Sequence, residues 1–136
     1  MRNRAQCLLA LHDMCSRFPN TTVVVDHFSN LAGRKEAPDY GVDGLLDDLV
    51  CFPHVFQKFT MINIGKLADQ GLSCAPVVKR MVQSYGADRV MWGSDVAQSK
   101  GSYAELVRRG LEGTSWLTES EQHQVVYQTA RSVYRS

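Results

Sequence analysis

The chain has 136 residues, of which 44% are hydrophobic and 21% charged, with fifteen basic and fourteen acidic side chains. These values are typical of one soluble, nearly neutral domain. A net charge of +1 provides no field that could hold a nucleic-acid backbone. The longest apolar runs fall far short of the roughly 18 residues of a membrane span. We therefore exclude nucleic acids and membranes as partners.

The four cysteines form no CxxC pair, and a chain of this length can bury a core without disulfides. No secretory signal is recognisable, because His12 and Asp13 interrupt the first apolar run and no small-residue cleavage site follows it. We expect reduced thiols and a cytoplasmic location.

Apolar residues at helical spacing over 4–18 predict a first helix, which Pro19 ends. The β-branched run 21–25 is too short for a helix and predicts a strand, whose continuous apolar character indicates that both faces are covered. A polar stretch over 28–42 then leads to a helix over 45–50.

The second strand is expected over 55–61 and is followed by a loop. The next helix begins near Pro76 and ends at Gly86, which are residues favoured in the first turn and at the C-cap. A third strand is expected over 89–92. Two helices, which begin at the capping residues Ser102 and Thr118, close the chain.

This order of elements is typical of consecutive βαβ units with a parallel sheet, so the predicted fold class is α/β. The connections from helix to strand are tight, whereas those from strand to helix are longer, and the first two reach a dozen residues or more. Because parallel α/β folds build their sites at the carboxyl ends of the strands, we expect any functional site at that edge.

Two candidate site residues follow predicted strands. The first strand leads into His27 and the third into Asp95. An imidazole and a carboxylate at neighbouring strand ends could form an acid/base pair or bind a metal, although a histidine after a strand is also a common loop residue. We assign structural or solvated positions to the remaining histidines, which are His12, His54 and His123.

Basic residues supply further candidates. Lys58 lies within the second strand, where a lysine has to be paired or line a cavity. Arg34 lies in the first long loop and could hold an anionic substrate. Other basic residues of the long loops could do the same. The alternative for these loop residues is simple solvation.

Three segments carry a resemblance to a known family. Asp26-His27-Phe28, the run 55–59 and, most specifically, the run 85–95 (YGADRVMWGSD) resemble the C-terminal portion of the amidohydrolase-related TIM-barrel hydrolases. Within this metal-dependent family, the nearest branch contains sugar lactonases and the pyrone-dicarboxylate lactonase. The resemblance extends over nearly the whole chain.

The resemblance implies a partial TIM-barrel-like (β/α) array. Its three parallel strands are similar to barrel strands six to eight, with flanking helices and a C-terminal helix pair, and residues 1–136 form a single partial domain. Asp95 matches the aspartate that activates water and that, in metal-using members, binds the metal, so the resemblance allows a divalent metal such as zinc without requiring one. His27 matches a histidine that assists catalysis or lies beside the metal. Lys58 matches a lysine often seen in the family, and the resemblance leaves its role open.

The chain also departs from the family pattern, because the His-x-His pair of the first barrel strand has no counterpart. A full metal site cannot be assembled from these residues alone. An array of three strands also leaves sheet edges that need cover, either from further copies of the chain or from a complementing N-terminal half.

Three functional hypotheses follow. The first is a hydrolase that activates water for attack on the lactone, ester or amide carbonyl of a small molecule, with Asp95 and His27 as catalytic residues and Lys58 and Arg34 as substrate-binding residues. The second is a non-catalytic α/β remnant that acts in oligomerisation or binding. The third is a decarboxylase of the same superfamily.

Overall fold

A computed structural model of the protein describes residues 3–135. Within this part of the chain, the sheet has three parallel strands in the order of the sequence: β1 (Val23–Val25), β2 (Val55–Thr60) and β3 (Val90–Gly93). The helices are α1 (Arg4–Arg17), α2 (Gly44–Asp47), α3 (Met61–Asp69), α4 (Ala75–Tyr85), α5 (Tyr103–Gly113), α6 (Glu119–His123) and α7 (Thr129–Tyr134). The shorter turns are η1 (Asp26–Asn30), η2 (Asp48–Cys51), η3 (Ala87–Arg89) and η4 (Gln124–Gln128), the last a π-helical turn between α6 and α7.

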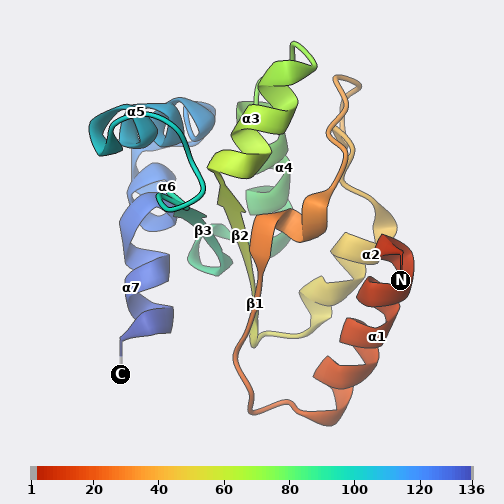
Figure 1. The fold of residues 1–136 in the computed structure, drawn as a ribbon. Helices are drawn as coiled ribbons and strands as arrows, with labels where there is room; N and C mark the ends of the chain where they lie inside the picture. The colour runs from red at the N-terminus through yellow and green to blue at the C-terminus, as the bar shows by residue number, and fades with distance from the viewer. Residues whose placement is uncertain (1–2, 136) are drawn as a thin grey trace.

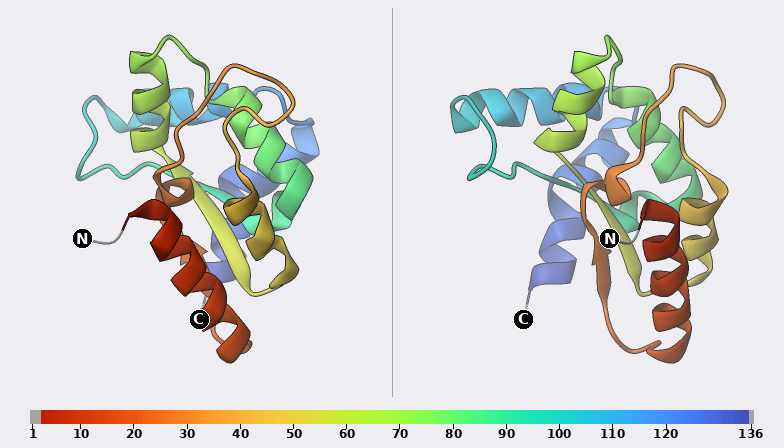
Figure 2. Two further views of the ribbon diagram at one scale, coloured as in Figure 1. Left: turned by 90° about the vertical axis from the view of Figure 1, so that its right-hand side faces the viewer. Right: turned by 45° about the vertical axis from the view of Figure 1, so that its right-hand side comes forward.

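The predicted α/β array with flanking helices is therefore confirmed. Figures 1 and 2 show α1 and α2 along one side of the sheet and α7 along the other, while α3 and α5 lie at the end toward which the strands point. The closing helices begin as expected, since the side chains of Ser102 and Thr118 accept hydrogen bonds from backbone amides of the first turn. No helix in residues 3–135 is long and apolar enough to cross a lipid bilayer.

The two faces of the sheet are covered to different degrees. Val55, Gln57 and Phe59 alternate along β2 on one face and are fully buried against the helices. Phe56 and Lys58 point to the other face and are only half-buried. Val23 and Val24 of β1 are half-buried as well, so the expectation that both faces of this strand are covered is wrong.

Helix α3 was not expected, because the sequence pattern predicts a loop after β2. The helix begins at the last residue of β2, where Thr60 and Asn63 form a reciprocal capping box that satisfies free amides of the first turn. Its buried residues Met61, Ile64 and Leu67 recur every three positions. The second connection from strand to helix is therefore direct, whereas the first is long, as predicted.

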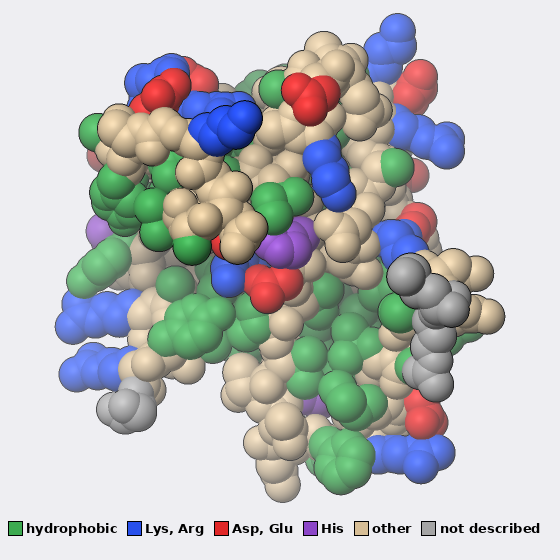
Figure 3. All heavy atoms as spheres, in the orientation of Figure 1, with side chains coloured by type: hydrophobic (Ala, Val, Ile, Leu, Met, Phe, Trp, Pro, Cys, Tyr) green, Lys and Arg blue, Asp and Glu red, His purple; other side chains and the backbone are tan. Residues whose placement is uncertain are grey.

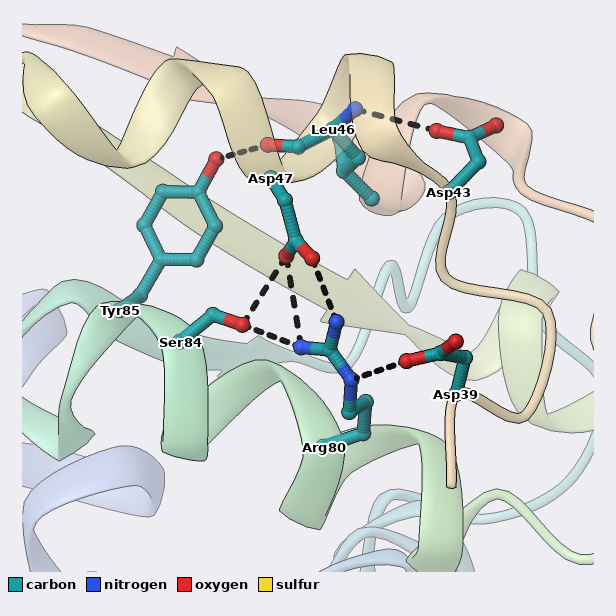
Figure 4. A network of polar contacts seen from close by, with 7 residues as sticks. All are labelled: Asp39, Asp43, Leu46, Asp47, Arg80, Ser84 and Tyr85. Carbon is teal, nitrogen blue, oxygen red and sulfur yellow. Dashed lines mark hydrogen bonds and ion pairs between the residues drawn. The ribbon is translucent and has the colours of Figure 1, made fainter. Parts of the chain in front are cut away.

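A polar network around Arg80 joins α2, α4 and the long first loop (Figure 4). The Arg80 guanidinium donates to both carboxylate oxygens of Asp47 and, at 3.0 Å, to Asp39. Ser84 donates a further hydrogen bond of 2.9 Å to Asp47. The Arg80 side chain is 14% exposed, so these charge-assisted bonds are shielded from much of the solvent. They fix the helical layer that supports the sheet.

We expect Arg80→Met to lower the free energy of unfolding by about 2 kcal/mol, because it leaves the half-buried Asp47 without its charged partner. Arg108→Met is the matched control, since the pair of Arg108 with Glu112 is largely exposed and its loss should cost less than about 0.5 kcal/mol. Urea denaturation of both variants measures the difference. Equal losses would show that the network around Arg80 adds no more than a surface ion pair.

Candidate active site at the carboxyl edge of the sheet

The chain leaves β1 through a left-handed turn. His27, Phe28, Ser29 and Asn30 all have positive φ angles, between 46° and 54°. Each such residue costs about 1–2 kcal/mol relative to right-handed backbone, so the turn needs support from its surroundings. Part of that support comes from Phe28, which is fully buried and packs on Phe59 with ring centroids 5.7 Å apart.

Hydrogen bonds from other elements hold the backbone of this turn. The Nδ2 of Asn63 donates to the carbonyl of His27 at 2.8 Å, and the Nε of Arg4 donates to the carbonyl of Ser29 at 2.8 Å. The ring of His27 is held as well, since its Nδ1 lies 2.7 Å from the Oγ1 of Thr60. The position of His27 is therefore set by contacts with β2 and α3.

An ion pair joins the first residue of η1 to β2. The Nζ of Lys58 lies 2.9 Å from the Oδ1 of Asp26, and the two side chains are 25% and 58% exposed. Gly93 on β3 leaves room for the lysine, because a Cβ there would lie 2.6 Å from the Cε of Lys58. Lys58 thus satisfies the expectation that a lysine in the sheet has to be paired.

The charges around Lys58 change its proton affinity. Burial by itself would lower the pKa of Lys58, but the hydrogen bond and charge of Asp26 outweigh burial, and smaller contributions come from Tyr134 and Asp95. The net result is a pKa above the ordinary 10.5. Lys58 is therefore a charged ammonium group at neutral pH, with Asp26 as its partner.

Asp95 follows β3 at the same edge. It is half-buried and has a φ of 49°, which places it in a second left-handed backbone conformation. Because the strands are parallel, their carboxyl ends bring Asp26, His27 and Asp95 to one edge of the sheet. Figure 3 shows a histidine beside acidic and basic side chains near the centre of the face turned to the viewer.

Arg34 lies elsewhere. It is exposed on the long loop after η1 and lines a separate hollow of about 540 Å³ together with Arg4, Asp39 and Asp43. No hydrogen bond or ion pair within residues 3–135 links it to His27. Its role in substrate binding stays a prediction.

The buried cysteines do not contribute a nucleophile. Burial raises the pKa of the Cys74 thiol to about 12 and also raises that of Cys15. Both thiols are therefore protonated at neutral pH, and they fill the core as small apolar side chains.

Comparison with known proteins identifies the family. The sequence profile of the amidohydrolases matches residues 2–136. The chain belongs to the amidohydrolase family. No curated protein matches it.

Solved structures agree with this family and with the predicted barrel portion. An amidohydrolase from Burkholderia multivorans, solved with bound HEPES, matches with a TM-score of 0.69 and 20% identity over 96% of this chain and 50% of its own. The same protein with bound zinc has a TM-score of 0.66, 21% identity and coverages of 96% and 49%.

A third structure comes from Pseudomonas putida and is provisionally assigned as a 2-pyrone-4,6-dicarboxylic acid hydrolase. It matches with a TM-score of 0.67 and 18% identity over 96% of this chain and 48% of its own. This amidohydrolase domain thus spans about half the length of the barrels it resembles.

The residues of this amidohydrolase domain do not by themselves fit a metal centre. No group of three or more histidine, cysteine, aspartate and glutamate side chains in the described part of the chain is arranged to hold an ion. His27 already uses its Nδ1 in the contact with Thr60, which leaves one ring nitrogen. Zinc sites take three or four protein ligands, so Asp95 and His27 are too few.

Two residues of the site were missed by the sequence analysis. Thr60 and Asn63 contact His27 directly, yet neither carries a charge or a nucleophile. The signal that could have found them is the Thr-x-x-Asn spacing at the end of β2, which marks a capping box and hence a helix start at the functional edge.

We expect Asp26→Asn to lower the pKa of Lys58, because the hydrogen bond and charge of Asp26 are the largest contributions that oppose burial. In the unmutated chain the folded pKa is raised. The ion pair's contribution to stability is therefore present in full below the unfolded pKa of 10.5 and is lost as the pH rises through the folded value.

An NMR titration of the lysine ammonium groups measures this pKa. Asp13→Asn serves as the control, since Asp13 is a carboxylate of similar exposure that pairs with Arg17 on α1. A pKa of Lys58 that stays raised in Asp26→Asn would show that the pairing with Asp26 does not control it.

Proposed function

We propose that this chain supplies the C-terminal part of the catalytic barrel of an amidohydrolase that hydrolyses a carbonyl compound of low molecular weight, namely a lactone, an ester or an amide. The observation that carries the proposal is the gathering of a half-buried carboxylate, a fixed imidazole and a charged lysine at the carboxyl ends of three parallel strands. Residues 1–136 then form a single, partial barrel domain.

Each side chain has a role in this reaction. The carboxylate of Asp95 accepts a proton from water as the water oxygen attacks the carbonyl carbon. The carbonyl oxygen becomes an oxyanion, which a hydrogen bond from His27 stabilises. When the tetrahedral intermediate collapses, the bond to the leaving group breaks, and the leaving oxygen or nitrogen takes the proton from Asp95. The products are a carboxylic acid and an alcohol or amine.

Lys58 and Arg34 are the proposed substrate-binding groups. The ammonium of Lys58 lies on the less covered face of the sheet and is within range of the charge of Asp95, so an anionic group of the substrate could replace Asp26 as its partner. Arg34 would contribute from the long loop, which requires that loop to approach the strand ends.

A divalent metal such as zinc enters this proposal only with ligands from outside the chain, and Asp95 is the ligand that the chain would offer. The zinc in one Burkholderia multivorans structure supports this part of the proposal. The pyrone-dicarboxylic acid hydrolase assignment of the Pseudomonas putida protein supports carbonyl hydrolysis. The steps above use only the residues of this chain.

We expect Asp95→Asn to lower kcat/KM for hydrolysis by about 10²–10⁴-fold, because the amide cannot accept a proton from water. The assay uses a panel of lactones, aryl esters and amides, with the chain assembled with the segment that supplies the other barrel strands. Asp48→Asn is the control, since Asp48 is an exposed carboxylate before β2, at the opposite end of the sheet.

Unchanged hydrolysis in Asp95→Asn would remove Asp95 as the base. An assembled barrel that hydrolyses none of these substrates would contradict the proposal as a whole. Release of carbon dioxide from an aromatic or muconate acid would then indicate the decarboxylase, and the absence of any turnover the non-catalytic domain.

A further inference from the structure

The contact between Thr60 and His27 determines more than the position of the ring. The Oγ1 of Thr60 lies 2.7 Å from the Nδ1 of His27, and either atom could carry the proton between them. If Nδ1 carries it, the bare Nε2 can act as a base or bind a metal. If Thr60 donates, Nε2 carries the ring proton and can only donate.

The hydrogen bonds of Thr60 decide between these two arrangements. A threonine hydroxyl has one proton and two lone pairs. In the capping box of α3, Oγ1 accepts from the backbone amide of Ile62 at 3.2 Å and from that of Asn63. Oγ1 therefore already serves as the acceptor for amides of the first turn, which disfavours a further proton donated from Nδ1.

The hydroxyl proton of Thr60 also needs an acceptor. Thr60 is fully buried, so solvent does not provide one. Among residues 3–135, Nδ1 of His27 is the acceptor within hydrogen-bond distance of this hydroxyl. A buried hydroxyl proton without an acceptor is costly, which favours donation from Thr60 to Nδ1.

The remaining ring nitrogen is open. Nε2 of His27 makes no hydrogen bond to the described residues, and it is not among their buried unpartnered atoms. Asn63 keeps the residue in place by donating to the carbonyl of His27 while accepting from the backbone amide of Thr60 at 2.9 Å. The ring therefore presents Nε2 from a backbone that the side chain of Asn63 holds in place.

We propose that Thr60 is a positioning residue that holds neutral His27 with its proton on Nε2, so that His27 acts as a hydrogen-bond donor to the carbonyl oxygen and not as the base. Asn63 assists by clamping the backbone of both residues. The catalytic part of this inference rests on the proposed hydrolase function. The assignment of the ring proton rests on the contacts of Thr60 alone.

The first test is long-range ¹H–¹⁵N NMR of the histidine rings in the full chain, recorded above the pH at which His27 titrates in the same experiment. The spectrum of His27→Gln identifies the signals of His27. We expect a protonated Nε2 and a bare Nδ1. A proton on Nδ1 would overturn the inference, whether or not the protein proves to be a hydrolase.

The second test compares Thr60→Val with Thr60→Ser. Valine removes the hydroxyl, so we expect kcat to fall by about tenfold or more with little change in KM, and the signals of His27 to show a mixture of ring forms. Serine retains the hydroxyl and should retain the kcat and the ring proton of the unmutated chain. Equal kcat values and unchanged ring signals in both variants would overturn the inference.

Thr118→Val separates this effect from the loss of a helix cap. Thr118 caps α6 through the same kind of capping box but makes no contact with His27. We expect it to leave kcat and the His27 signals unchanged. A loss of kcat in Thr118→Val equal to that in Thr60→Val would assign the effect of Thr60 to helix capping and overturn the inference.

Discussion

The arrangement of this edge of the sheet depends on the side-chain amide of Asn63. Its oxygen accepts from the backbone of Thr60 and its nitrogen donates to the carbonyl of His27, so one buried side chain joins the end of β2 to the turn that follows β1. The turn has four consecutive residues with positive φ, a conformation that persists only where the surroundings hold it. The start of α3 and the position of His27 are therefore a single structural unit.

The charge of Lys58 is likewise maintained by a residue from another element. Lys58 enters a partly covered sheet face, which would favour its neutral form, but Asp26 lies close enough to keep it charged. Asp95 approaches from the neighbouring strand end and adds to the same field. Asp26 is therefore the partner that an anionic group would share or displace at Lys58.

The sheet within residues 3–135 has two strands that each pair on one side alone, since β1 and β3 both pair with β2. The chain spans about half the length of the solved amidohydrolases that it resembles, and a complete barrel of this kind has eight strands. The face that carries Phe56 and Lys58 is the less covered one. In the proposed barrel, residues from the other half would cover that face.

The sequence by itself determined the three strands, the long first loop and the placement of His27 and Asp95 at strand ends. These depend on local signals such as β-branched runs, Pro76, Gly86 and the run 85–95. The resemblance to the amidohydrolases could also be recognised from the sequence, because short continuous segments carry it. What the sequence could not show is a contact between positions distant in the chain.

Only the tertiary structure decided that Thr60 and Asn63 belong to the site. They lie 33 and 36 positions from His27 in the sequence. Their local sequence pattern predicts helix caps and gives no sign of a contact with His27. The fold also decided that Lys58 is partnered by Asp26 and that Arg34 lies in another hollow. The physical reason is that the partner of a capping hydroxyl or of a charged side chain comes from a neighbouring strand end. Parallel pairing of the strands brings the two partners together, although they are far apart in the sequence.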